Sequence, residues 1–247
     1  MQIFKKKFTE GLKKIGIKNG DLVFCHSSLF PFKKKSKKKI LQLCNNIFKS
    51  FFEVIGSNGT LVVPTFTYSV SNNKPYFKNK SKQICGYFSE YVRKKKKSLI
   101  YNDPNVSVAV VGNLKKKLTK NPTINSYAKN SFFDRFVKLN GKICNINLDA
   151  ASTFIHYFER KCKVNYRYDK KFYGLNENKK IACVLYVRKL KKKYEVNFKK
   201  FNKEVFKKKY YKTFSIGESY VGAININEVE NIVIQNLKKD KHFLVNG

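Results

Sequence analysis

Hydrophobic positions near the start of the chain change from a helical to a strand-like period. Helical spacing relates the apolar residues Ile3, Phe4, Phe8, Leu12 and Ile15. The pair Asn19-Gly20 then predicts a turn into a short apolar strand at residues 21–25. Residues 39–55 place most apolar side chains on one broad face, and Gly56 ends this second helix before a buried strand at 60–63. The pattern predicts a helix followed by a β-α-β unit.

The rest of the chain alternates between strand-like and helical apolar patterns. Strands are expected at 106–111, 142–148, 181–188, 194–198 and 220–226, and helices at 86–93, 151–161, 200–210 and 227–238. Residues 68–82 are rich in Ser, Asn and Lys and have no period, which predicts a long loop beside a site. No internal repeat or change of composition divides the chain. We therefore predict the fold class α/β, as a single domain over residues 1–247 with a mixed central sheet flanked by helices.

The formal net charge of +37 raises the alternative of a nucleic-acid-binding protein. A hydrophobic content of 42% excludes a disordered basic chain. Arg, which reads phosphates and guanine edges bidentately, occurs only at positions 93, 135, 160, 167 and 188. The over-used residues Lys, Asn, Ile, Phe and Tyr share A/T-rich codons, so a coding bias explains the excess of Lys. We therefore expect no nucleic-acid partner.

The cysteines and the hydrophobic runs indicate the compartment. None of the six Cys forms a C-x-x-C pair, and most have apolar neighbours, which favours free thiols in a reducing cytoplasm. No apolar run is long enough to span a membrane, and no signal peptide is visible, so we expect a cytoplasmic protein without a membrane partner. Phosphate-binding loops, a nucleophile elbow and zinc-ligand spacing are also absent, and no metal is expected.

His156 is the strongest candidate for proton transfer among only three histidines. It falls in a predicted helix that follows a strand, with Ser152 or Asp149 expected to cap that helix. Thr153, His156 and Glu159 recur at steps of three residues and share one helix face. Glu159 can therefore orient the imidazole and raise its basicity, as a general base requires. A structural ion pair on a helix explains this spacing equally well.

Polar side chains also follow two predicted strands. His26-Ser27-Ser28-Leu29 comes after the strand at 21–25, and Pro64-Thr65-Phe66-Thr67-Tyr68 comes after the strand at 60–63. Open α/β sheets place ligands at the carboxyl ends of such strands, so both exits are expected to border one pocket. An ordinary turn with Ser side chains on the backbone is the alternative. Cys25 and His26 point to opposite faces of an extended chain and are not expected to form a nucleophilic pair.

Taken in order, these motifs resemble the aminoglycoside 3-N-acetyltransferase family. The similar segments are Val23–Leu29, Gly59–Thr67, Gly86–Arg93, Asp103–Ala109 with Gly112, Ser126–Asp134, the Thr153-x-x-His156-x-x-Glu159 signature and Ser215–Ala223. No single motif is decisive, but together they cover most of the chain. The resemblance implies direct transfer of an acetyl group from acetyl-CoA to an amine of an amino sugar, without a metal, and leaves a homodimer open.

The resemblance also implies roles for individual residues. His156 and Glu159 would be catalytic. The residues implied to hold coenzyme A are His26, Ser27, Ser28, Leu29, Thr65, Phe66, Thr67 and Ser107. Those implied on the acceptor side are Asp103, Asp149 and Thr153.

The chain departs from the family pattern mainly on the acceptor side. Asp103-Pro104 replaces a frequent His-Pro, Val106 replaces a second His, and Lys-rich sequence replaces a Gly pair after the first loop. The segment 164–174 resembles members associated with surface-sugar biosynthesis, and a Lys-rich pocket suits an anionic nucleotide sugar better than a polycationic aminoglycoside. A catalytically inactive coenzyme A-binding member is a further alternative, against which the retained His156 and Glu159 argue.

Overall fold

A seven-stranded sheet forms the centre of the computed structural model, which describes residues 2–32 and 35–246. The strand order is β3-β4-β2-β1-β5-β9-β8. The strands are β1 (Leu22–Ser27), β2 (Thr60–Pro64), β3 (Leu99–Tyr101), β4 (Val108–Gly112), β5 (Lys142–Ile146), β8 (Lys212–Ile216) and β9 (Ser219–Asn225). β1 runs parallel to β2 and β5, whereas β4 and β9 pair antiparallel with β2 and β5. The predicted mixed sheet is confirmed.

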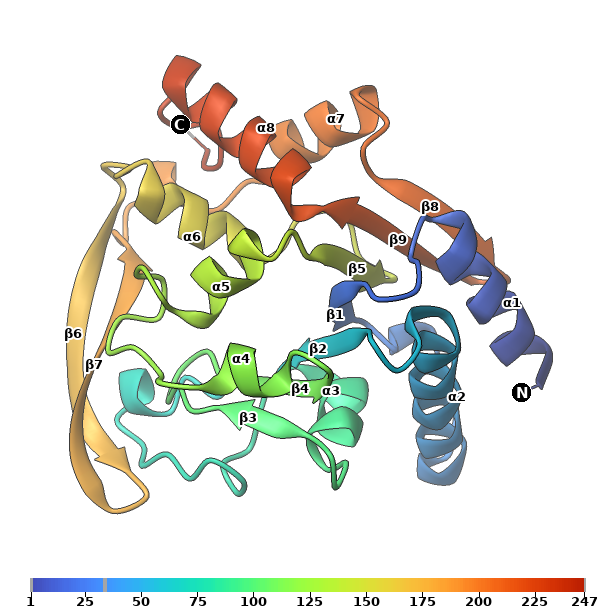
Figure 1. The fold of residues 1–247 in the computed structure, drawn as a ribbon. Coiled ribbons are helices and arrows are strands. Elements are labelled where there is room, and N and C mark those ends of the chain that lie inside the picture. The colour runs from blue at the N-terminus through green and yellow to red at the C-terminus, as the bar shows by residue number, and fades with distance from the viewer. Residues whose placement is uncertain (1, 33–34, 247) are drawn as a thin grey trace.

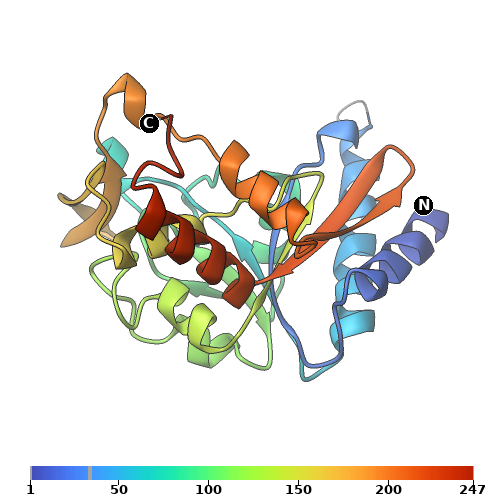
Figure 2. The same ribbon diagram turned by 90° about the horizontal axis from the view of Figure 1, so that it is seen from above.

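Helices cover both faces of this sheet (Figures 1 and 2). The helices are α1 (Gln2–Lys14), α2 (Lys37–Ile55), α3 (Gly86–Arg93), α4 (Lys115–Thr119), α5 (Phe132–Lys138), α6 (Phe154–Lys161), α7 (Lys199–Lys207) and α8 (Ile226–Lys239). Side chains of α1, α2 and α3 form one hydrophobic core with Val23 and Cys25 of β1. Those of α4 to α8 form the other core with Leu22 and Phe24. Because side chains alternate along a strand, His26 follows the phase of Phe24 and faces the side of α6.

A two-stranded hairpin stands beside the central sheet as a long curved ribbon (Figure 1). It consists of β6 (Arg167–Asn176) and β7 (Lys179–Arg188), which pair antiparallel along their whole length. A parallel bridge joins Val184 of β7 to Asn125, and another joins the end of β6 to Tyr76. β6 begins shortly after the end of α6, and its first residue, Arg167, and the preceding Tyr166 reach the site described below.

Most of the predicted elements are found. The strand expected at 194–198 is wrong, because a short 3-10 turn at Lys192–Tyr194 is followed only by an isolated antiparallel bridge between Val196 and Val245. Tyr194 is buried in the core, and with Val196 and Phe198 it gives this loop the alternation of a strand. The pattern also missed β3, β6, β8, α4 and α5. Among the described residues, no helix is long and apolar enough to cross a membrane.

Candidate active site

Two cavities adjoin at the carboxyl end of β1. The first has a volume of about 710 Å³ and is lined by the two strand exits, by Lys35 and Lys37, and by the segment 84–87. The second has a volume of about 600 Å³ and is lined by the start of α6 and by residues 196–199. His26, Leu148 and Thr153 line both cavities. The expected crevice between the strand exits is therefore present, and it leads directly to α6.

His156 and Glu159 form a close pair at the second cavity. The Nδ1 atom of His156 lies 2.6 Å from Oε2 of Glu159, which is three residues, or about one turn, further along α6. The His156 side chain is 23% exposed and lines the cavity, whereas that of Glu159 is 1% exposed. The spacing seen in the sequence thus places an imidazole toward the cavity with a buried carboxylate behind it.

Two residues that the sequence analysis missed complete the surroundings of Glu159. The hydroxyl of Tyr166 donates to Oε1 at 2.9 Å, and Nε of Arg167 lies 2.7 Å from Oε2. Burial disfavours the charged carboxylate, but His156, Arg167 and Tyr166 outweigh burial and lower the pKa of Glu159. Glu159 is therefore ionised at neutral pH. The sequence held one signal for Arg167: in a chain dominated by Lys, an Arg indicates a position where the geometry of a guanidinium is needed.

His26 has a different environment at the junction of the cavities. Its Nε2 lies 3.1 Å from Oγ of Ser152, and burial lowers the pKa of His26 from 6.5 to about 4. His26 is therefore neutral at physiological pH. The predicted capping of α6 by Ser152 or Asp149 is wrong: Thr153 occupies the cap position without a side-chain hydrogen bond. The Ser152 hydroxyl contacts His26 instead, and Asp149 lines the second cavity.

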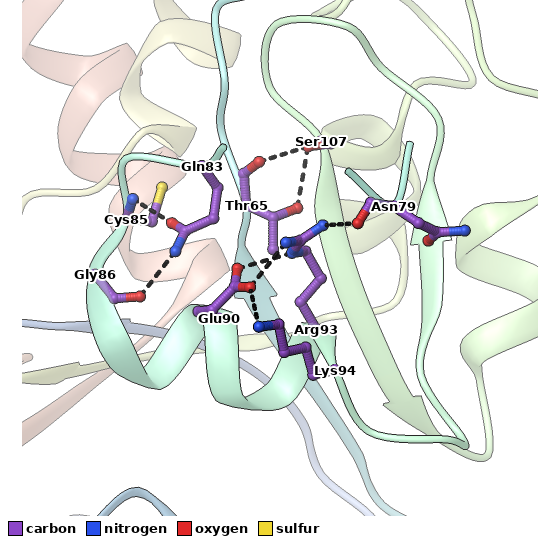
Figure 3. A network of polar contacts seen from close by, with 9 residues as sticks. All are labelled: Thr65, Asn79, Gln83, Cys85, Gly86, Glu90, Arg93, Lys94 and Ser107. Carbon is purple, nitrogen blue, oxygen red and sulfur yellow. Dashed lines mark hydrogen bonds and ion pairs between the residues drawn. The ribbon is translucent and has the colours of Figure 1, made fainter. Parts of the chain in front are cut away.

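The residues implied to hold coenzyme A divide into two groups. His26 to Leu29 and Phe66 line the first cavity. Thr65 and Ser107 are buried behind it, where Ser107 Oγ donates to the Thr65 carbonyl at 2.6 Å and lies 3.0 Å from Thr65 Oγ1 (Figure 3). Thr67 Oγ1 donates to the carbonyl of Pro104 at 2.9 Å. This second group fixes the end of β2 against the chain leading into β4 and does not line the cavity.

Side chains of α3 and of the loop before it form a network of polar contacts (Figure 3). Arg93 donates to Glu90 at 2.8 and 2.9 Å and to the carbonyl of Asn79 at 2.7 Å. The Gln83 side chain bonds the backbone of Cys85 and of Gly86. These contacts fix the loop that carries Ile84 into the cavity wall.

The residues implied on the acceptor side are not all brought together. Asp149 and Thr153 line the second cavity. Asp103 is 2% exposed and lines neither of the two cavities. Its Oδ1 accepts hydrogen bonds from the backbone N–H groups of Asn105 and Val106, both at 2.8 Å, and burial raises its pKa despite these bonds. Asp103 therefore shapes the turn that precedes β4.

No metal site accompanies these groups in the part of the chain that the structure describes. Residues 2–32 and 35–246 contain no cluster of three or more His, Cys, Asp or Glu side chains that could hold a metal ion.

Comparisons with known proteins point to one family. The sequence model described as aminoglycoside 3-N-acetyltransferase matches residues 24–238. No curated protein matches the chain. Among solved structures, AAC-IIIb in a binary complex with CoASH is 13% identical, with a TM-score of 0.78 over 95% of this chain and 96% of that one.

Two further structures are similar in fold. A variant of the aminoglycoside acetyltransferase AAC(3)-IVa in complex with apramycin is 16% identical, with a TM-score of 0.77 over 97% of this chain and 93% of that one. The YokD protein from Bacillus subtilis is 16% identical, with a TM-score of 0.76 over 96% of this chain and 99% of that one. At these identities, the likeness shows the shared fold.

The sequence match includes both strand exits, the whole of α6 and the hairpin that carries Arg167. It covers well over half of the 247 residues. The chain belongs to the aminoglycoside 3-N-acetyltransferase family of acetyl-CoA-dependent N-acyltransferases.

Proposed function

We propose that this protein transfers the acetyl group of acetyl-CoA directly to an amine of an amino sugar, with His156 as the general base. The observation that carries the proposal is the His156–Glu159 pair. The imidazole of this pair lines the second cavity, and the first cavity adjoins the second at His26. The two cavities give a place for each of two substrates, and the imidazole lies where the acceptor would enter.

The chemistry requires a base at this position. An amine is mostly protonated at neutral pH and cannot attack a thioester until it loses a proton. If Nδ1–H of His156 donates to Glu159, Nε2 is left free to take that proton. The new C–N bond forms as the C–S bond breaks. Of the two protons that the ammonium group gives up on becoming an amide, one passes through His156 to the departing thiolate and the other is released to solvent. No acyl-enzyme intermediate is needed.

The first cavity is the proposed site of acetyl-CoA. Leu29 and Phe66 offer apolar contacts to the pantetheine arm, and Lys35 and Lys37 offer positive charge to its phosphates. The relative AAC-IIIb was solved with CoASH, which supports this assignment. The donor to the thioester oxygen, where negative charge develops in the transition state, would come from the hydroxyl or backbone N–H groups at this strand exit.

The second cavity is the proposed site of the amino sugar. Asp149 offers a carboxylate for a substrate ammonium group, and Thr153, Asn197 and Asn202 offer hydrogen bonds to hydroxyl groups. A relative bound to apramycin supports an amino-sugar acceptor. Lys199 is the other fixed charge in the lining, so the cavity carries one negative and one positive side chain. This balance favours a nucleotide-linked amino sugar over a polycationic aminoglycoside.

The compartment follows from the same proposal. Acetyl-CoA and six free cysteines favour the cytoplasm. The chain would act there as a single N-acetyltransferase domain over residues 1–247.

The test is release of free thiol from acetyl-CoA in the presence of nucleotide amino sugars and aminoglycosides. We expect an amino sugar to stimulate thiol release and to gain one acetyl group by mass. Coenzyme A binding without stimulation by any amine would instead identify an inactive family member. Absence of coenzyme A binding would overturn the assignment of the first cavity.

A further inference from the structure

The Glu159 carboxylate is shared between a histidine and an arginine from different elements. Oε2 lies 2.6 Å from Nδ1 of His156 on α6 and 2.7 Å from Nε of Arg167, the first residue of β6. Nη1 of Arg167 also donates to the carbonyl of Tyr186 on β7 at 3.2 Å. The guanidinium is therefore held by the hairpin, independently of the helix that carries the catalytic pair.

Little water reaches this ion pair. The side chains of Arg167 and Glu159 are 7% and 1% exposed. A buried carboxylate without a cation would favour a proton on the neighbouring imidazole, and an imidazolium has no lone pair to accept a substrate proton. A guanidinium stays charged at every relevant pH, so it balances the carboxylate permanently and opposes a second positive charge on His156.

We propose that Arg167 is a positioning residue that balances the charge of Glu159 and thereby keeps His156 neutral, with its proton on Nδ1 and its Nε2 atom free. Tyr166 assists by fixing the other carboxylate oxygen. This inference rests on the proposed role of His156 and adds the device that makes it a base at neutral pH.

The other ionisable groups around the pair do not replace Arg167. Tyr127 lies beside the imidazole with ring centroids 6.3 Å apart, and burial raises its pKa well above the ordinary value. Burial likewise raises the pKa of Tyr186 to about 12 and further raises that of Tyr166. These tyrosines stay neutral, as does His26. Asp149 and Lys199 line the open second cavity, where solvent access screens their charges.

The first test uses the native protein. Nitrogen-15 labelling of its three histidines, with His26→Gln and His242→Gln for assignment, reports the tautomer and charge of each ring. We expect His156 to be neutral at about pH 7 with its proton on Nδ1. An imidazolium at that pH, or a proton on Nε2 instead, would overturn the inference.

The second test compares pH profiles of kcat/KM. In Arg167→Gln, the permanent positive charge beside Glu159 is lost, so the acidic limb of the profile should move upward by about one to two pH units. Arg167→Lys keeps the charge and should keep the limb in place, although the rate falls because ammonium fits the site less well. Tyr166→Phe, the matched neutral change, should lower the rate without an upward shift of the limb.

The outcomes separate this inference from the proposed function. A uniform loss of rate in Arg167→Gln, with an unmoved acidic limb, would reduce Arg167 to a structural role. If Arg167→Gln does not fold, the native spectrum and the Arg167→Lys profile still decide. Retained turnover in His156→Ala would instead overturn the proposed role of His156 as the general base. The tautomer of His156 in the native protein would still test the role of Arg167, because that measurement requires no acceptor substrate.

Discussion

His26 and His156 both line the second cavity, yet only His156 has a carboxylate partner. His26 has the Ser152 hydroxyl and an aromatic neighbour, Phe24, whose ring centroid is 4.8 Å away. Nothing in this contact set favours an added proton, so burial dominates and the ring stays neutral. Two histidines of the same cavity therefore differ in their hydrogen-bond partners, and only His156 is placed to act with a carboxylate.

The His26→Gln variant tests this difference through stability. The pKa of His26 falls from 6.5 to about 4 on folding, so the unfolded chain binds a proton that the folded protein does not. Native stability should therefore decrease between about pH 6.5 and pH 4, by about 2 kcal/mol at pH 5 from this group. Urea unfolding of both proteins at several pH values should show a flatter profile for His26→Gln. Identical pH slopes would contradict the burial of His26.

Glu159→Gln should destabilise the protein and abolish most turnover. It leaves the buried Arg167 without its carboxylate, which costs about 3–5 kcal/mol at neutral pH. Because the pKa of Glu159 is lowered on folding, the stability it contributes is present above its ordinary value of 4.5 and is lost as the pH falls below it. The difference from the native protein should thus shrink in acid, as measured by denaturant titration.

Asp240→Asn is the control for that variant. Its ion pair with Lys200 is exposed, so it should cost at most about 1 kcal/mol at neutral pH. Equal losses in the two carboxylate variants would show that the surroundings of Glu159 are not special.

Residue spacing could predict one half of the proposed catalytic site. Three steps along a helix bring His156 to Glu159 in any α-helix, and the contact follows. Tyr166 and Arg167 lie beyond the end of α6, where the turn that leads into β6 places them against Glu159, and helical spacing does not extend to that turn. Asp103 is a residue that the family motif wrongly implied on the acceptor side. Its carboxylate accepts hydrogen bonds from backbone N–H groups instead of facing either cavity.

At the scale of elements, the segment that leads into α7 forms a wall of the second cavity, the proposed acceptor site. The N–H of Asn197 donates to the carbonyl of Leu244 at 3.0 Å, and Val196 is bridged to Val245. The Phe198 ring that follows has its centroid 6.4 Å from that of His156. The returning C-terminal residues therefore hold an aromatic ring beside the proposed base.

Phe198→Ala should weaken acceptor binding selectively. Loss of the ring removes apolar contact next to the base, so the KM for the acceptor should rise about tenfold while coenzyme A affinity stays unchanged. Phe206→Ala is the matched control, because that half-exposed ring on α7 lines neither of these cavities. Steady-state kinetics with each substrate varied in turn would measure both. A parallel loss of coenzyme A affinity would contradict this division of the site.

Three central strands that the pattern predicted are almost wholly buried. β1, β2 and β5 are short apolar runs because helices cover both faces of the central sheet. β6 escaped prediction because its residues after Arg167 are mostly exposed and carry no clean alternation. The segment 194–198 misled for the opposite reason, since core anchoring gave a loop the apolar spacing of a strand.

At the scale of the whole molecule, the formal charge of +37 acts on any charged substrate that approaches. An anionic nucleotide-linked amino sugar is attracted by this field, whereas a polycationic aminoglycoside is repelled. The value of kcat/KM should therefore fall with added salt for the former and rise for the latter, because salt screens both effects. Initial rates across a salt series would measure this. Equal salt dependence for both classes would contradict a role of the net charge in acceptor choice.

The central claim is that His156 removes the acceptor proton during direct transfer. It is tested most directly by mixing enzyme, acetyl-CoA and the best acceptor for a single turnover, and following acetylated product in the native protein, His156→Ala and the surface control Tyr173→Ala. We predict that His156→Ala binds coenzyme A normally but forms product about 10²–10⁴-fold more slowly, while the control matches the native protein. A rate in His156→Ala within tenfold of the native one would contradict the account.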